Sequence, residues 1–250
     1  MCFDSDSLPP IPVISGAAVS HDDLTLEAAD GNRFAAFLAT PDESGATGIV
    51  ILPDIRGLYR FYEELALRFA ERGHAAIAID YFGRTAGVEK RGDEFEYMPH
   101  VEQTTTEGVQ ADVAACVAHL RQRGATSIFT VGFCFGGRHS WLAAASGHGI
   151  AGAVGFYGRP GKGRDGTPGP TARAAEIAAP VLALMGGNDP GIPLEDVNAF
   201  EEALAAARAE HEVVVYPGAP HSFFDRKQEE FAEASEDAWR RTLEFVARHA

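Results

Sequence analysis

The fold is decided by the stretch Ser127-Ile128-Phe129-Thr130-Val131-Gly132-Phe133-Cys134-Phe135-Gly136-Gly137. Its first five residues form a short, mostly apolar run that predicts a buried strand, and a helical pattern begins at Gly137. Gly132 and Gly136 carry no side chain where such a strand and helix nearly touch, so the residue between them can adopt strained backbone. The stretch therefore predicts a sharp turn from strand to helix with Cys134 at its tip.

Apolar runs of the same kind recur and predict further buried strands, because they are too short and too β-branched for helices. The predicted strands are 48–52, 75–79, 127–131, 151–156, 181–185 and 212–216, and 24–28 and 33–39 are predicted to form an opening hairpin. Helical patterns lie at 61–72, 107–123, 137–146, 194–208 and 228–248. The alternation predicts an α/β fold with a mostly parallel sheet of about eight strands, helices on both faces, and chemistry at the carboxyl ends of the strands.

Length and composition fit one globular domain over residues 1–250, with 1–20 as an extended N-terminal segment. The chain has 250 residues, of which 46% are hydrophobic and 23% charged. No linker-like stretch divides it. The connections 81–103 and 157–170 are long, and long loops in a compact domain are usually functional or disordered.

The charge balance argues against one class of partner. Lys and Arg number 21 and Asp and Glu 36, so the net charge is −15, which disfavours binding to nucleic acid. An anionic small substrate would need arginines placed locally in its pocket. The N-terminus has no basic or apolar targeting region, and no apolar span of about 18 residues occurs, so we expect a soluble cytoplasmic protein with no membrane partner.

Three cysteines, Cys2, Cys116 and Cys134, leave one unpaired under any disulfide scheme, which fits a reducing compartment. Cys134 is predicted to start a helix, where unpaired N–H groups and the helix dipole favour the thiolate. The alternative is an inert, buried thiol, which we prefer for Cys2 and Cys116. Cys134 is therefore the candidate nucleophile.

A thiol nucleophile needs a base, and the base needs an acceptor that orients it. Asp189 follows the predicted strand 181–185, and His221 follows the strand that ends near residue 216. The order nucleophile, acid, histidine is the one found in enzymes built on such a strand-to-helix turn. The other histidines lie on predicted helices or in polar and terminal surroundings, and the alternative for Asp189 is a simple turn residue.

A nucleophile of this kind also needs an oxyanion hole, made from the N–H after the nucleophile and an N–H from the loop after an earlier strand. These donors are predicted to be Phe135 and Ile55. Ile55 lies in Pro53-Asp54-Ile55-Arg56-Gly57, directly after the predicted strand 48–52. Asp54 would then lie beside the thiol.

With these residues in place, the chain resembles the dienelactone hydrolase family (carboxymethylenebutenolidases) from about Arg33 to the C-terminus. The matching motifs are Pro53-Asp54-Ile55-Arg56-Gly57, Asp80-Tyr81-Phe82-Gly83-Arg84, Gly132-Phe133-Cys134-Phe135-Gly136-Gly137, Phe156-Tyr157-Gly158, Gly187-Asn188-Asp189 and His221-Ser222-Phe223. The resemblance implies an α/β-hydrolase fold with Cys134, Asp189 and His221 as the catalytic triad. It also implies that a carboxylate, here the short Asp54 in place of the usual glutamate, holds the resting thiol.

Members of the family bind a substrate carboxylate with two arginines, and Arg84 matches the first. The second usually follows the catalytic histidine by four residues, where this chain has Asp225, with Arg226 one place later. Arg159, beside Tyr157, could take that role from the long loop, so Arg84, Tyr157, Arg159 and Arg226 are the candidate substrate-binding residues.

The implied reaction is attack of the Cys134 thiolate on an ester or lactone, followed by hydrolysis of a thioester, with no metal or other cofactor. The expected partner is a small-molecule substrate, and the protein is expected to be a monomer or homodimer. A broad esterase, or a hydrolase of other activated esters such as phosphotriesters, is the alternative reaction. A catalytically silent ligand-binding module is the alternative from another class.

Overall fold

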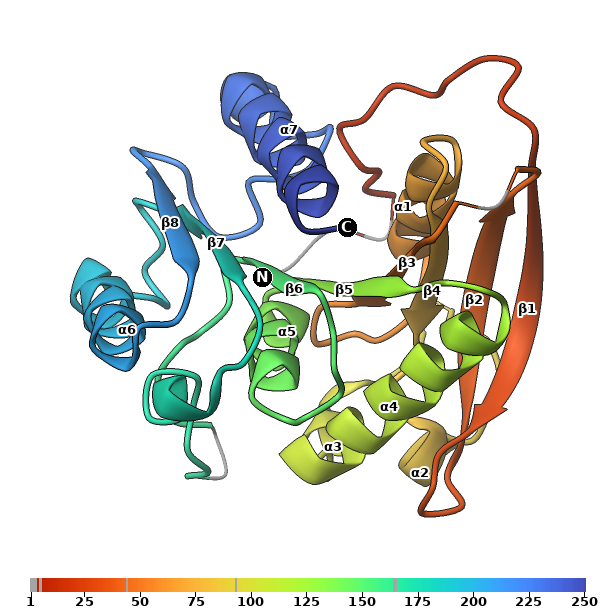
Figure 1. Ribbon diagram of the computed structural model, residues 1–250, viewed down its shortest axis with the longest axis horizontal. Helices are drawn as coiled ribbons and strands as arrows, with labels where there is room; N and C mark the ends of the chain where they lie inside the picture. The colour runs from red at the N-terminus through yellow and green to blue at the C-terminus, as the bar shows by residue number, and fades with distance from the viewer. Residues whose placement is uncertain (1–3, 5, 44, 93, 164–165) are drawn as a thin grey trace.

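The computed structural model describes residues 4, 6–43, 45–92, 94–163 and 166–250. Its sheet has eight strands in the order β1-β2-β4-β3-β5-β6-β7-β8. Figure 1 shows how the labelled strands follow one another across the molecule. The strands are β1 Val19–Glu27, β2 Arg33–Pro41, β3 Thr47–Leu52, β4 Ala75–Ile79, β5 Ser127–Phe133, β6 Gly152–Phe156, β7 Val181–Gly186 and β8 His211–Tyr216. The predicted strands are confirmed, although β1 begins five residues earlier than predicted.

The sheet is mixed in the way the sequence predicts. β1 and β2 form the opening antiparallel hairpin, and β2 pairs antiparallel with β4. From β4 through β3, β5, β6 and β7 to β8 every pairing is parallel. In the register between β3 and β5, Leu52 pairs with Gly132, so the loops that leave these two strands start side by side.

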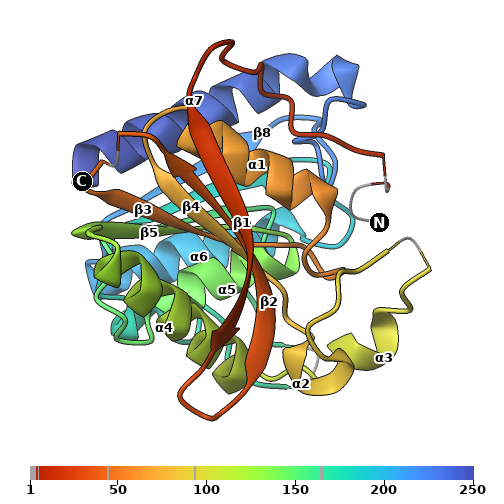
Figure 2. The same ribbon diagram turned by 90° about the vertical axis from the view of Figure 1, so that its right-hand side faces the viewer.

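Helices cover both faces of the sheet, as Figures 1 and 2 show. One face packs against α4 Thr106–Gln122, α5 Phe135–Ala144 and α6 Leu194–Ala207, and the other against α1 Arg60–Ala70 and α7 Ala232–His249. Each face has its own hydrophobic core, with the fully buried Trp141 in one and Phe129 in the other. This arrangement explains the uniformly apolar strands, because a strand covered on both sides buries every side chain.

The predicted helices are confirmed, with shifted ends. α5 begins at Phe135 rather than Gly137, directly after the tip residue Cys134. The helical pattern from 228 begins with the short 3-10 helix η2 Glu229–Phe231, and α7 starts at Ala232. The long connection 81–103 contains two four-residue helices, α2 Gly83–Ala86 and α3 Met98–Val101, which sequence periodicity does not predict.

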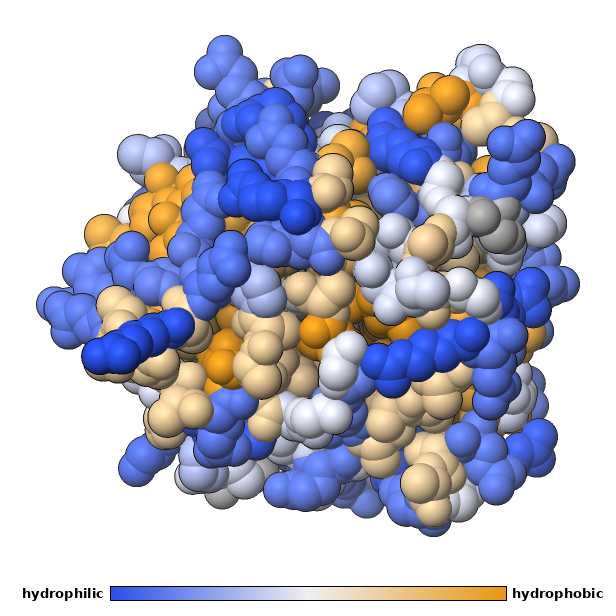
Figure 3. All heavy atoms as spheres, in the orientation of Figure 1, coloured by the Kyte–Doolittle hydropathy of each residue, from blue (hydrophilic) through white to orange (hydrophobic). Residues whose placement is uncertain are grey.

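The surface is divided between polar and apolar regions. Figure 3 shows hydrophilic side chains gathered over α7 and a hydrophobic patch over the edge strand β8, whose valines are half-buried. Of the helices within the described ranges, none is long and apolar enough to cross a membrane.

Candidate active site

The turn around Cys134 is the strained element of the site. Cys134 has a φ of 54° and a ψ of −111°, a conformation that residues with a side chain rarely adopt. A Cβ on Gly132 would lie 2.0 Å from the carbonyl oxygen of Gly136, and one on Gly136 would lie 2.0 Å from that of Leu52. The predicted strand-to-helix turn is thus confirmed, and both positions require glycine.

The turn places the thiol at the carboxyl end of the sheet. The backbone N–H of Cys134 donates to the carbonyl of Phe156 at the end of β6, at 3.0 Å. Cys134 itself is half-buried, whereas Cys116 on α4 is fully buried. Burial raises the pKa of the Cys116 thiol well above its usual value, which keeps it protonated. Cys2 lies outside the described residues.

Asp189 and His221 meet at the ends of the next two strands. Nδ1 of His221 lies 2.6 Å from Oδ2 of Asp189, and the Asp189 side chain is 2% exposed. The other carboxylate oxygen accepts a backbone N–H from Gly191 at 2.8 Å. The bond between Nδ1 and Asp189 fixes the orientation of the imidazole, so that Nε2 is the ring nitrogen directed away from the carboxylate.

Tyr157 lies at the end of β6, between the strands that lead to Cys134 and Asp189. Its φ is 36°, its ring is fully buried, and the ring centroid lies 5.0 Å from that of His221. A second contact joins it to Phe133, at 6.2 Å between centroids. Tyr157 therefore forms part of the wall against which the histidine packs.

The loop after β3 forms a tight turn, which two hydrogen bonds from its own backbone N–H groups stabilise. The N–H of Gly57 donates to the carbonyl of Asp54 at 3.1 Å, and the N–H of Arg56 donates to the Asp54 carboxylate at 2.9 Å. The N–H of Asp54 donates to the hydroxyl oxygen of Tyr62 at 2.8 Å. Within the described turn 54–57, Ile55 is then the residue whose N–H is not used to hold the turn.

The second candidate donor lies in contact with this turn. Phe135 is the first residue of α5, where a backbone N–H has no partner within the helix. The N–H of the next residue, Gly136, donates to the carbonyl of Pro53 at 3.0 Å. The structure therefore brings the loops that carry Ile55 and Phe135 together.

Asp54 is completely buried, and Arg56 is its cationic partner. The guanidinium lies 3.2 Å from Oδ2 and 3.4 Å from Oδ1, and the Tyr59 hydroxyl donates to Oδ2 at 3.0 Å. The guanidinium also donates to the Tyr59 hydroxyl and lies 4.2 Å above its ring. Burial acts to lower the pKa of Arg56, but the charge of Asp54, its hydrogen bond to Arg56 and the nearby hydroxyls of Tyr59 and Tyr62 together outweigh burial and raise that pKa.

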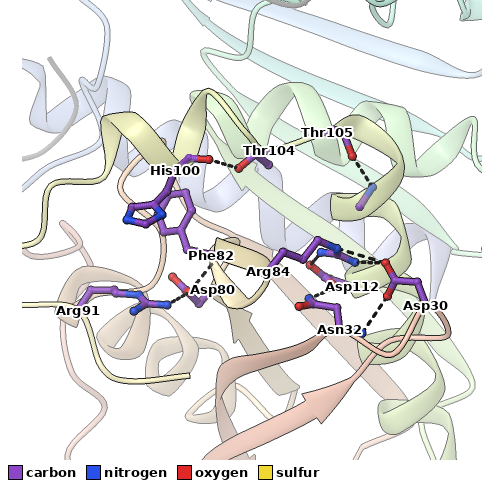
Figure 4. A network of polar contacts seen from close by, with 11 residues as sticks. Asp30, Asn32, Asp80, Phe82, Arg84, Arg91, His100, Thr104, Thr105 and Asp112 are labelled. Carbon is purple, nitrogen blue, oxygen red and sulfur yellow. Dashed lines mark hydrogen bonds and ion pairs between the residues drawn. The ribbon is translucent and has the colours of Figure 1, made fainter. Parts of the chain in front are cut away.

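Arg84 lies on α2, and two carboxylates hold it, as Figure 4 shows. Its guanidinium donates to Asp112 at 2.7 Å and to Asp30 at 2.7 and 3.2 Å. Asp112 also accepts the Asn32 side chain at 3.0 Å. Burial acts to lower the pKa of Arg84, but the hydrogen bonds to both carboxylates outweigh it and raise that pKa.

The other candidate arginines lie on loops. Arg159 is exposed, and its carbonyl accepts a hydrogen bond from Arg138 of α5 at 3.4 Å. Arg138 also donates to the carbonyls of Gly161 and Pro168, so it holds the long loop after β6. Arg226 is exposed, and its guanidinium lies 3.5 Å from the carbonyl of Pro9.

The loop after His221 is fastened to the N-terminal segment. Asp225 is buried and accepts the Ser7 hydroxyl at 2.6 Å. The N–H of Arg226 donates to the carbonyl of Leu8 at 3.0 Å, and Lys227 pairs with two acidic side chains of the same segment. Figure 2 shows this segment beside the loop that leads into α7. Asp225, which stands where the resemblance implies an arginine, is therefore paired with Ser7 of the N-terminal segment.

The sequence alone did not indicate several residues that lie around Cys134. Arg56, Tyr59 and Tyr81 lie in or beside the motifs around Pro53 and Asp80, but no role could be assigned to them from spacing. Arg138 follows Gly137 at the start of α5, and nothing in the sequence around it predicted a role. Each of them acts through partners that only the folded chain brings near.

Comparison with known proteins gives consistent matches. The sequence model of the dienelactone hydrolase family matches residues 34–250 of this chain. A carboxymethylenebutenolidase of Rhodococcus opacus is 30% identical over 100% of this chain and 97% of its own length. A candidate carboxymethylenebutenolidase of Salmonella typhimurium is 34% identical over 90% of this chain and 87% of its own length. A solved structure of a candidate dienelactone hydrolase from Klebsiella pneumoniae matches with a TM-score of 0.80 and 29% identity, over 92% of this chain and 99% of its own.

Proposed function

The chain belongs to the dienelactone hydrolase family, and on that premise we propose that it hydrolyses lactones or other carboxylic esters through Cys134, His221 and Asp189. The observation that carries the proposal is the hydrogen bond of 2.6 Å between His221 and Asp189, at the same edge of the sheet as the strained Cys134 turn. A cysteine in a structural role would need neither the strained backbone nor an oriented imidazole.

The proposed reaction has two halves. His221 takes the thiol proton, and Sγ of Cys134 attacks the carbonyl carbon, so that the carbonyl oxygen becomes an oxyanion held by the N–H groups of Ile55 and Phe135. The oxyanion collapses, the C–O bond to the alcohol breaks, and His221 returns the proton to the leaving oxygen. Water, deprotonated by His221, then attacks the thioester and releases the acid together with the thiol.

We propose that Asp54 shapes the turn 54–57, which we call the oxyanion turn because it carries the N–H of Ile55. Its carboxylate accepts the N–H of Arg56 and is held by the Arg56 guanidinium and the Tyr59 hydroxyl. These bonds fix the backbone on both sides of Ile55.

The substrate class depends on Arg84. A carboxylate-bearing lactone would need the Arg84 guanidinium, which is held by Asp30 and Asp112. Asp112 is completely buried, whereas the Asp30 side chain is 47% exposed, so Asp30 is the partner that a substrate carboxylate could displace. Because both carboxylates already neutralise Arg84, a neutral ester is the second candidate substrate.

Hydrolysis of p-nitrophenyl acetate tests the nucleophile. The wild type should release p-nitrophenol and gain one acetyl group at Cys134 in intact-mass spectra of quenched samples, and Cys134→Ala should do neither while unfolding at a similar temperature. Cys116→Ala is the matched control, because its thiol is fully buried. Hydrolysis that persists in Cys134→Ala would overturn the proposal.

A comparison of cis-dienelactone with p-nitrophenyl acetate tests the substrate class. If Arg84 binds the substrate carboxylate, Arg84→Ala should raise KM for the anionic lactone by about 10-fold to 100-fold and leave the neutral ester unchanged. Asp30→Asn, which removes the competing charge, should then lower KM for the lactone alone. Equal effects on both substrates would favour the neutral ester.

A further inference from the structure

The oxyanion turn can stabilise an oxyanion only if its position relative to α5 is fixed. A backbone N–H stabilises a developing oxyanion only when it is aimed at the position that the charge will occupy, with an error of about 0.5 Å. The turn 54–57 is a short loop between β3 and α1, and the bonds within it fix its shape but not its place relative to α5. Contacts from another element have to set that place.

One end of the turn is held by Tyr81. Its hydroxyl donates to the carbonyl of Pro53 at 2.8 Å, and Tyr81 is 3% exposed. The same carbonyl accepts the N–H of Gly136 at 3.0 Å. The Pro53 carbonyl, two residues before Ile55, is therefore fixed by one donor from β4's exit and one from the helix that starts with Phe135.

The other end is held by the residue before Tyr81. Oδ1 of Asp80 accepts the N–H of Leu58 at 3.2 Å, and Arg91 pairs with Oδ2 at 2.9 Å, as part of the network in Figure 4. A Cβ on Gly57 would lie 2.5 Å from Oδ1, so the turn sits directly on this carboxylate. Asp80 and Tyr81, adjacent in the chain, thus hold the two ends of one turn.

The Tyr81 ring contacts the other donor. Its centroid lies 5.1 Å from that of Phe135, with the rings at 76° to one another. Burial, with the charges of Asp54 and Cys134, raises the pKa of Tyr81 well above its usual value, so the hydroxyl keeps its proton. Tyr81 is therefore available as a donor to the turn throughout the neutral pH range.

From these contacts we infer that Tyr81 is a positioning residue for the oxyanion hole, which sets the N–H of Ile55 against that of Phe135 through the Pro53 carbonyl. The inference rests on the proposed function, because it assigns a role within the same reaction. Tyr81 touches neither the breaking bond nor the proton that moves.

Tyr81→Phe removes the hydroxyl and keeps the ring. Two reactions of Cys134 separate its effects: acylation by p-nitrophenyl acetate forms an oxyanion, and alkylation by iodoacetamide does not. We expect the acylation rate constant to fall about 10-fold, less than for loss of a donor, and the alkylation rate constant to stay within about twofold. Cys134→Ala gives the background from the other thiols.

Tyr216→Phe is the matched control, because it also loses one part-buried hydroxyl bond, to Asp237 at 2.9 Å, and Tyr216 lies on the edge strand β8 rather than beside the turn after β3. It should leave both rate constants unchanged. Thermal unfolding of both variants measures how far loss of a hydroxyl changes stability by itself.

Each result decides the inference. Acylation that falls while alkylation is preserved supports it. If both rate constants fall in parallel, Tyr81 affects the reactivity of the Cys134 thiol itself. If neither rate constant falls, Tyr81 has only a packing role. Either result overturns the inference. A wild type that is alkylated at Cys134 but never acylated would overturn the proposed function and, with it, the role of Tyr81.

Discussion

Replacing Arg56 with methionine should destabilise the protein through the charge it leaves behind. Asp54 is completely buried, and the Arg56 guanidinium is its only cationic contact among the described residues. Removal of one partner of a buried ion pair costs about 3–5 kcal/mol. The Tyr59 hydroxyl and the backbone N–H of residue 56 remain as donors, so we expect the lower end, about 3 kcal/mol.

The charge can be removed separately. In the double variant Asp54→Asn with Arg56→Met, the amide oxygen still accepts the backbone N–H, and no charge is buried. We expect this variant to lose only about 1 kcal/mol, which leaves about 2 kcal/mol as the cost of the unpaired carboxylate. Urea unfolding, followed by tryptophan fluorescence, measures both free energies. The described ion pair is contradicted if Arg56→Met lowers the free energy of unfolding by less than about 1 kcal/mol. It is also contradicted if adding Asp54→Asn restores none of the lost free energy.

Three further changes test other parts of the structure. Gly136→Ala would place a Cβ 2.0 Å from the Leu52 carbonyl oxygen, so the turn must move; we expect at least a 10-fold loss of esterase activity in the assay above. Asp189→Asn should lower kcat by about 10³-fold or more, with the unfolding temperature nearly unchanged, because the imidazole loses its charged acceptor; a near-normal kcat would contradict the triad. Burial, with the charge of Arg72, lowers the pKa of His74, so around this pKa the folded state binds fewer protons than the unfolded state. The free energy of unfolding should therefore fall from pH 7 to pH 5. It should fall less in His74→Asn, which lacks the imidazole.

Those parts of the fold and the site that depend on local pattern could be predicted from the sequence. Each buried strand has an apolar run of its own, and the glycines around Cys134 reflect a clash between strand and helix that any such turn must avoid. Asp189 and His221 could be predicted because strand ends of a parallel sheet meet at one edge.

Side-chain partners could not be predicted in the same way. Arg84 pairs with Asp30 and Asp112, which lie 54 and 28 residues away in the chain, and nothing in its local sequence distinguishes these carboxylates from the others. The four-residue helices α2 and α3 are too short for a periodic pattern. Tyr81 resembles any aromatic residue at a strand end until its distance to the Pro53 carbonyl is known.

The bond between Ser7 and Asp225 has a consequence for the order in which the chain folds. It joins residues 218 positions apart, so its formation closes nearly the whole chain into a loop. Contacts at such separation form late in folding, and chain ends are the first parts of a native protein to open. We expect amide hydrogens of residues 222–228 to exchange faster with solvent in Ser7→Ala than in the wild type. The N-terminal segment would then complete the loop that carries His221 only after the last strand of the sheet is in place.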